Sequence, residues 1–176
     1  ITVHINHKLR HESDFDEQFV RDMSRDLNIP FRSKSLDLKS KPRKQSIEEW
    51  GREERYSFLK TILIKDKGRW IMTAHHANDQ AETILMNLSR KSGVTGLRGI
   101  SKENDKVLRP FLDFTKTDIL NFSKEIGLPF REDKTNHDNT IPRNFLRNKI
   151  LETWENEFPE VIHGISRSSN LFLSLI

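Results

Sequence analysis

The chain alternates short apolar runs with segments of helical period, and this alternation limits its possible folds more than any other feature. Residues 1–6 alternate apolar and polar side chains as a strand does, and residues 14–27 carry apolar side chains at helical spacing. Trp70–Ala74 is a compact apolar run typical of a buried parallel strand. Further strands are expected at 31–38 and 107–109, and further helices at 47–64, 78–90, 115–126, 144–154 and 159–175.

Strands that alternate with helices of about a dozen residues predict βαβ units. We therefore expect an α/β fold, a doubly wound parallel sheet with right-handed crossovers, followed by C-terminal helices. Ligands of such sheets bind beyond the carboxyl ends of the strands. Because His7, Arg10 and the segment His75–Glu82 each follow a strand, we expect them at this edge.

Short-range signals mark several helix ends. Capping boxes, in which a Ser or Thr precedes an acid by three residues, are expected at Ser13–Asp16, Ser46–Glu49 and Thr115–Asp118. Gly127 is the expected left-handed residue after the helix that Thr115 opens.

The composition excludes several kinds of site. The 176 residues include no cysteine, which excludes disulfides, thiolate–zinc sites, iron–sulfur clusters and a cysteine nucleophile. No run approaches the roughly 20 apolar residues that span a bilayer, and no signal peptide opens the chain, so we expect a cytoplasmic protein without membrane contact. The net charge of +4 favours a polyanion such as RNA, although a solvated basic surface explains it equally well. One loop concentrates the excess at Lys39, Lys41, Arg43 and Lys44.

Two histidines and two acids gather in the segment 73–83. Asp79 and Glu82 are three residues apart, which puts both carboxylates on one face of a helix, where they can hold a cation. By spacing alone the favoured reading is an N-terminal capping pair, since acids there also suit the helix dipole. A zinc site is disfavoured, because the adjacent His75 and His76 point apart and zinc normally needs three or four ligands.

Three more charged segments have simple structural readings when each is taken alone. His4–Arg10 ends with a cation at the sheet edge, but a solvated turn explains it. Arg52 and Arg55 are three apart in a glutamate-rich helix, where exposed ion pairs are common. Asp133–Arg147 brings guanidinium groups to a helix start, a good place for an anion, but a capped polar loop explains it too.

Taken together, these segments resemble the motifs of tRNA(Ile)-lysidine synthetases, a family of PP-loop ATPases, across nearly the whole chain. The family shows H-x-N-H-x-L-R, A-R-x-x-R-Y, T-A-H-H-x-x-D-Q-x-E-T, and D-x-x-N-x-D followed by R-N-x-x-R. The corresponding stretches are His4–Arg10, Gly51–Tyr56, Thr73–Thr83 and Asp133–Arg147, and Arg90–Ile100 and Arg109–Leu112 are also similar to the family. Gly51 departs from the usual Ala, and Asn148-Lys149 departs from a common Ile-Arg pair.

The resemblance implies a nucleotide-binding PP-loop core at residues 1–130 and a helical part of the same catalytic domain at 131–176. It implies that free L-lysine is ligated to C2 of the wobble cytidine of a tRNA(Ile) with a CAU anticodon, through an adenylated tRNA, with ATP and Mg²⁺. The S-G-G-x-D-S loop that wraps the ATP phosphates in this family is missing from the sequence. Since that loop precedes the strand at Ile1 in the family, we expect a fragment whose own activity is uncertain.

The resemblance also implies roles for single residues. Arg52 and Arg147 would stabilise phosphate charge as catalytic groups, and His75 would orient substrates or handle a proton. Asp79 and Glu82 would bind the lysine ammonium group. The remaining implied contacts are to ATP or phosphate by His7, Arg10, Arg55, Arg143 and Asn144, and to RNA by Lys39, Lys41, Arg43 and Lys44. The resemblance identifies neither a metal ligand nor the oligomeric state, for which a dimer is one option.

Other readings of the chain stay open. A tRNA thiolase shares the fold but typically relies on cysteine pairs, which are absent here. NAD and GMP synthetases share the ATP chemistry but carry signatures different from His75–Glu82. From another class, the chain could be a non-catalytic RNA-binding remnant of the family.

Overall fold

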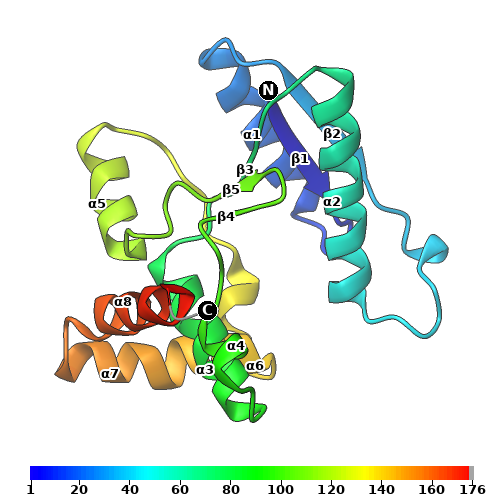
Figure 1. Ribbon diagram of the computed structural model, residues 1–176. Coiled ribbons are helices and arrows are strands. Elements are labelled where there is room, and N and C mark those ends of the chain that lie inside the picture. Colours follow the sequence, from blue (N-terminus) through cyan, green and yellow to red (C-terminus); the bar gives the residue numbers. More distant parts are fainter. Residues whose placement is uncertain (175–176) are drawn as a thin grey trace. The chain divides into compact units, whose positions relative to one another are not determined.

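The computed structural model describes residues 1–174, except for the side chains of Lys134, Leu173 and Ser174. The chain divides into two compact units, Ile1–Ile71 and Met72–Ile176 (Figure 1). This division differs from the expected one at residue 130, which separates an α/β core from a helical part and stays a prediction.

The first unit is built on a parallel βαβ arrangement. Strand β1 (Thr2–Asn6) pairs in parallel with β2 (Phe31–Ser35), with Thr2 opposite Phe31. Helix α1 (Ser13–Asp26) connects the two strands and packs against both of them (Figure 1). The predicted parallel pairing and its helical crossover are confirmed in this unit.

Helix α1 begins without the predicted capping box. Its N-cap residue is Glu12, no side chain caps it, and Ser13 is already helical. The Asp16 carboxylate accepts a hydrogen bond from Arg10 Nη2 at 2.5 Å. The capping box at Ser13–Asp16 was therefore wrong, because the acid that would complete it is bound to an arginine of the preceding turn.

Helix α2 (Ile47–Lys65) follows the basic loop of the first unit. Its N-cap is Ser46, whose Oγ accepts from the backbone N–H of Glu49 at 3.1 Å, so the predicted start is confirmed. The predicted capping box is only half formed, because the Glu49 side chain does not accept from the Ser46 N–H. The strand expected to reach Leu38 ends at Ser35, and a 3₁₀ turn, η1 (Leu38–Ser40), opens the basic loop instead.

A small sheet in the order β3-β5-β4 begins at the boundary between the units, and β5 and β4 lie in the second unit. Strand β3 (Ile71–Met72) is shorter than the apolar run that predicted it, and β5 (Val107–Leu108) pairs antiparallel with β4 (Glu103–Asn104). Strand β4 was not predicted, because a two-residue polar strand has no periodicity. Its local signal is the turn at Asp105, which has a φ of 53°.

Helices make up most of the second unit. They are α3 (Ala77–Ser89), α4 (Val94–Leu97), α5 (Lys116–Glu125), the 3₁₀ turn η2 (Lys134–His137), α6 (Pro142–Phe145), the π-helical turn η3 (Leu146–Leu151), α7 (Glu152–Glu157) and α8 (Val161–Ser174). The core lies where α3 packs against α8 and η3, at Ala77, Ala81, Leu151 and Ile162. The small alanines let these helices approach closely.

The helix ends of the second unit mostly follow their signals. Thr115 and Asp118 form the predicted capping box of α5, and Gly127 has the predicted left-handed backbone with a φ of 65°. The helix expected from residue 144 begins earlier, because Pro142 occupies its first position. The last helix was expected to reach Leu175, which lies outside the described residues.

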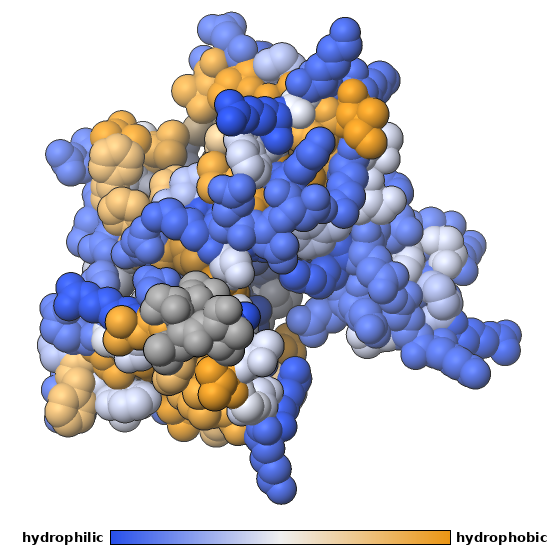
Figure 2. Space-filling view, in the orientation of Figure 1, coloured by the Kyte–Doolittle hydropathy of each residue, from blue (hydrophilic) through white to orange (hydrophobic). Residues whose placement is uncertain are grey.

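Polar residues cover much of the face that Figure 2 shows. Apolar residues lie among them, and the polar cover agrees with the 32% of charged residues in the chain. Within residues 1–174, no helix combines the length and apolar character needed to cross a bilayer.

Candidate functional site

A buried carboxylate gathers two arginines in the second unit. Glu82 on α3 is 0% exposed. It accepts hydrogen bonds from Arg147 Nε at 2.6 Å and Nη2 at 3.1 Å, and from Arg143 Nε at 2.5 Å. Bidentate arginine–carboxylate pairs are strong and directional. Glu82 therefore fixes the orientation of two guanidinium groups that come from α6 and η3.

Asp79 lies one helical turn before Glu82, and its two carboxylate oxygens make different contacts. Its Oδ2 accepts from the backbone N–H of His76 at 3.0 Å, and its Oδ1 accepts from Arg143 Nη2 at 3.1 Å. The capping interpretation thus holds for Asp79, with His76 as N-cap. It does not hold for Glu82, which binds the arginines instead.

The charges of this cluster shift the pKa of its members. Burial lowers the pKa of His76, a shift that the carboxylates of Asp79 and Glu82 oppose. The pKa of Arg147 is raised, since its hydrogen bond to Glu82 and the two negative charges outweigh burial. The cluster therefore places the His76 imidazole, which burial makes harder to protonate, beside the Arg147 guanidinium, which Glu82 and Asp79 keep charged.

Asparagines tie the polar loop of residues 133–138 to this cluster. Arg147 Nη1 donates to Asn136 Oδ1 at 3.0 Å. Asn144, which is buried, donates to the carbonyls of Thr135 and Asp138 at 2.8 and 3.0 Å. Asn144 therefore holds the loop in place, and its expected contact with ATP stays a prediction.

A pocket of about 380 Å³ lies beside the cluster, within the second unit. Arg147, His76 and Lys116 line it together with apolar and polar neighbours. The apolar wall includes Ile119 and Phe130. Pockets of this size with a few converging polar groups are common binding sites for small molecules.

The first unit places another group of the expected site residues together. Arg55 Nη2 lies 3.3 Å from His7 Nε2. Burial, followed by the charges of Arg55 and His4, lowers the pKa of His7. A neutral His7 with its proton on Nδ1 can accept from Arg55. A side chain at Gly51 would put its Cβ 3.0 Å from the His7 ring, so the small residue makes room for the imidazole.

The glutamates of α2 do not neutralise its arginines. Arg52 lies over the ring of Tyr56, with 5.0 Å from its guanidinium carbon to the ring centre. Glu54 pairs with Lys34 at 2.7 Å instead. Among the described residues neither Arg52 nor Arg55 has a carboxylate within 4.0 Å, so the expected surface ion pairs were wrong. Both cations stay available to an anion.

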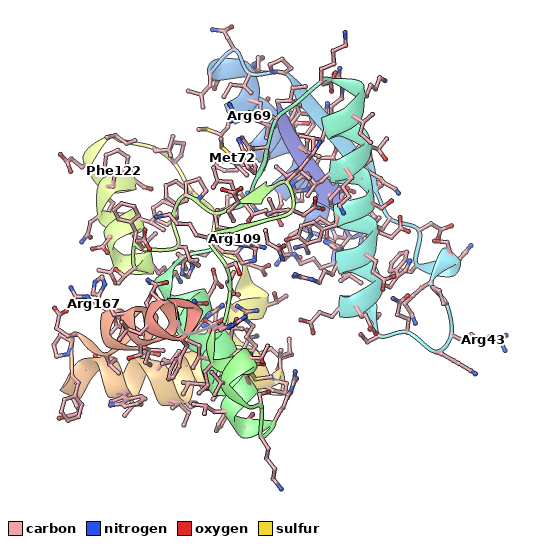
Figure 3. The ribbon with its side chains drawn as sticks, in the orientation of Figure 1. Arg43, Arg69, Met72, Arg109, Phe122 and Arg167 are labelled. Carbon is pink, nitrogen blue, oxygen red and sulfur yellow. The ribbon has the colours of Figure 1, made fainter. Side chains whose placement is uncertain are left out.

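The remaining expected residues lie at other places. Arg10 is paired with Asp16, and His75 Nδ1 lies 2.8 Å from Thr73 Oγ1. In the basic loop, Lys41 Nζ donates to the carbonyls of Pro42 and Gln45, whereas the side chains of Lys39, Arg43 and Lys44 are exposed (Figure 3 labels Arg43).

Sequence reasoning missed His76 and Lys116 as lining residues of the pocket. His76 had a signal, because it precedes the acid that caps the same helix. Lys116 had none, since its position beside Arg147 depends on how α5 packs. The structure thus joins Asp79, Glu82, Arg143 and Arg147 in one cluster, and His7, Gly51 and Arg55 in another.

The described residues do not form a metal cage. In the part of the chain that the structure covers, no three His, Cys, Asp or Glu side chains meet in a group that would hold a metal ion. Mg²⁺ is usually held by one or two carboxylates and substrate phosphates, so its protein ligands stay unassigned. The arginines do fit the phosphates of a nucleotide.

Comparison with known proteins gives matches along most of the chain. The model of the PP-loop domain family matches residues 1–154. The tRNA(Ile)-lysidine synthase of Thermotoga sp. (strain RQ2) is 36% identical over 93% of this chain. The tRNA(Ile)-lysidine synthase of Thermosipho africanus is 40% identical over 84% of it. The chain spans 40% and 35% of the length of these relatives.

A solved structure supports the fold. The U34-tRNA thiolase from Methanococcus maripaludis, which carries a [4Fe-4S] cluster, matches 99% of this chain and 62% of its own with a TM-score of 0.79. The sequence identity is 14%, so this likeness concerns the fold alone. The predicted α/β fold class is confirmed.

Proposed function

We propose, from the premise that this chain belongs to the PP-loop domain family, that it ligates free L-lysine to C2 of the wobble cytidine of a tRNA(Ile) at the expense of ATP. The similarity to tRNA(Ile)-lysidine synthases over most of the chain supports this substrate set. The single observation that carries the proposal is the buried Glu82, which holds Arg143 and Arg147 in fixed directions.

The chemistry requires two anionic leaving groups. In the first step the base oxygen attacks the α-phosphate of ATP and pyrophosphate leaves. In the second the lysine amine forms a bond to C2, AMP leaves, and the amine loses a proton. Preorganised guanidinium groups stabilise such developing charge without reorganisation. We assign this role to Arg147 and Arg52, and a supporting role to Arg143 and Arg55.

Arg52 and Arg147 support this assignment in different ways. The carboxylate of Glu82 holds Arg147 by two hydrogen bonds, and 26% of its side chain stays exposed. Arg52 has no carboxylate within 4.0 Å among the described residues, so its charge is not neutralised by the fold. An anion binds most strongly to a cation that is held in a fixed direction or has no other counter-charge.

We assign the lysine ammonium group to the acidic pair Asp79 and Glu82, next to the pocket lined by His76 and Arg147. Both carboxylates already face guanidinium groups, so an ammonium ion would have to share them with Arg143 and Arg147. Apolar Ile119 and Phe130 would suit the aliphatic stem of lysine. His75 is proposed to orient the amine or accept its proton.

The basic loop is proposed to contact tRNA phosphates. Lys39, Arg43 and Lys44 are exposed, and among the described residues none of them forms an ion pair. Lysine and arginine side chains of this kind neutralise RNA phosphates and release counterions. Lys41, which donates to two backbone carbonyls, would shape the loop as well as add charge.

The test is a reaction of the chain with ATP, radiolabelled L-lysine and a tRNA(Ile) transcript with a CAU anticodon. The proposed activity transfers label to the tRNA and forms AMP and pyrophosphate. A transcript with a UAU anticodon is the matched control, since it lacks the wobble cytidine. An RNA-binding remnant would bind the tRNA but transfer no label, even when the chain is extended upstream by the S-G-G-x-D-S loop.

A further inference from the structure

The segment of residues 98–109 is locked in place by one buried amide. Gln80 on α3 is 1% exposed. Its Oε1 accepts from the N–H of Ile100 at 2.5 Å, and its Nε2 donates to Ser169 Oγ at 2.7 Å and to the carbonyl of Ile100 at 3.2 Å. A buried side chain with this many partners holds its segment rigidly.

Gly99 allows this close approach. Its φ is +62°, and a Cβ at this position would lie 2.4 Å from Gln80 Oε1. Any residue larger than glycine at position 99 would push the Gln80 amide out of its place. The position of the Gln80 side chain therefore depends on a glycine at position 99. The carbonyl of Ser101, two residues further along, then accepts from Arg109 Nη1 at 2.6 Å. The locked segment therefore fixes the Arg109 guanidinium.

Arg109 is a buried cation without a counter-charge. It is 7% exposed, and its Nε is hidden from solvent without a hydrogen-bond partner. Among the described residues no carboxylate lies within 4.0 Å of its guanidinium. Burying an unpaired charge is expensive, so folded chains retain one where a ligand supplies the opposite charge.

Arg98, on the same segment, is only half-buried but also lacks a counter-charge. Its Nε is also hidden from solvent without a partner, and the described residues again provide no carboxylate within 4.0 Å. Its backbone is fixed, because its carbonyl accepts from Gln80 Nε2 at 3.3 Å. Arg109 directly follows β5, and ligands of α/β sheets bind where strands end.

We propose that the segment of residues 98–109 binds phosphate groups, with Arg109 as the principal cation and Arg98 as a second cation on the same segment. The planar guanidinium matches the oxygens of a phosphate, and a fixed guanidinium loses little freedom when it binds. This site goes beyond the proposed function, because it lies outside the cluster around Glu82 and needs no lysine. The phosphate belongs either to a nucleotide or to an RNA backbone, two sources with the same chemistry.

The test measures binding of inorganic pyrophosphate to the chain by calorimetry. The variants are Arg109→Met and Arg98→Met, and the matched control is Arg167→Met, which removes an exposed arginine from α8 (Figure 3). The expected result is a loss of about tenfold or more in affinity for the first two and none for the control. Arg109→Met should also be at least as heat-stable as the parent chain without ligand, since an unpaired buried charge is removed.

Wild-type affinity in both Arg109→Met and Arg98→Met would overturn the proposal. If Arg109→Met does not fold, Arg109→Lys replaces it, because it keeps the charge but lacks the Nε donor. Pyrophosphate affinity equal to that of the parent chain in Arg109→Lys and Arg98→Met would likewise overturn it. The measurement is repeated with ATP and with an anticodon stem-loop RNA to identify the source of the phosphate. The variants should bind more weakly than the parent chain only to the ligand whose phosphate occupies this site. These readouts need no lysine transfer, so they are independent of the proposed reaction.

Discussion

Arg147 donates two parallel hydrogen bonds to Glu82, from Nε to Oε1 at 2.6 Å and from Nη2 to Oε2 at 3.1 Å. The two residues are 65 positions apart, so the pair joins the middle of α3 to the π-helical turn η3. Because Glu82 is fully buried and Arg147 is partly exposed, the carboxylate acts as an anchor and the guanidinium faces the pocket.

Replacing Glu82 by Gln removes the anchor charge at constant shape. We expect the free energy of unfolding to fall by roughly 1–3 kcal/mol, less than for a fully buried pair because solvent screens both arginines. If the acidic pair also binds lysine, the KM for lysine rises while ATP binding is retained. Urea unfolding and lysine titration check these two effects.

Glu125→Gln is the control for this change, because Glu125 is exposed. An unchanged lysine KM in Glu82→Gln would remove Glu82 from the lysine site. Weaker ATP binding with an unchanged lysine KM would show instead that Glu82 acts only by positioning its arginines.

Gly51→Ala should leave stability nearly unchanged but move His7. Alanine favours the helix by about 1 kcal/mol over glycine. The new Cβ would stand 3.0 Å from the His7 ring, and pushing the ring aside costs a similar amount. We expect the pKa of His7 to rise toward its ordinary value as the imidazole leaves its half-buried place beside Arg55. NMR titration of the imidazole measures it, and an unmoved His7 resonance would contradict the steric argument.

Much of this architecture was predictable, because it depends on local signals. The βαβ unit, the start of α2 at Ser46 and the end of α5 at Gly127 all follow from periodicity and capping residues. What could not be predicted depends on packing between distant segments. The sequence shows that Glu82 is acidic, but only the fold shows that two arginines more than 60 positions away bury it.

The same reasoning explains the errors at single residues. Asp16 fits a capping box by spacing, yet its carboxylate binds Arg10 of the preceding turn instead of the helix N-terminus. The arginines of α2 fit surface ion pairs by spacing, yet Arg52 lies over an aromatic ring and Arg55 approaches a histidine. Spacing gives the possible partners of a charged side chain, and tertiary contacts choose among them.

Stability should fall as the pH drops below about 6.5. Burial is the largest cause of the lowered pKa of His4, His7 and His76, whose ordinary value is 6.5. The unfolded chain then binds protons at a higher pH than the folded chain, so folding stability is complete above 6.5 and is lost as the pH falls toward the lowered values. Urea unfolding at pH 7.5 and 5.5 measures the loss, and His76→Gln should reduce it. A pH-independent midpoint would contradict this sign.

The basic loop should determine the salt dependence of RNA binding. Replacing Lys39, Arg43 and Lys44 by Ala removes three exposed cations. Each lost phosphate contact should reduce the slope of log affinity against log salt by about one. Filter binding of tRNA at several salt concentrations gives the slope. An unchanged slope would exclude the loop from the RNA interface.

Gly99 and Gly127 offer a matched pair for testing the Gln80 lock. Both have a positive φ, +62° and +65°, so alanine at either position incurs a similar backbone penalty of about 1 kcal/mol. The surroundings differ, because a Cβ at Gly127 meets no atom within 4 Å, whereas one at Gly99 would lie 2.4 Å from Gln80 Oε1. Gly99→Ala should therefore destabilise the chain by clearly more than Gly127→Ala, with an excess of roughly 1–3 kcal/mol from displacing the buried amide and its hydrogen bonds. Equal losses in urea unfolding would mean that the amide yields easily, and the 98–109 segment would then be too loosely held to fix Arg109.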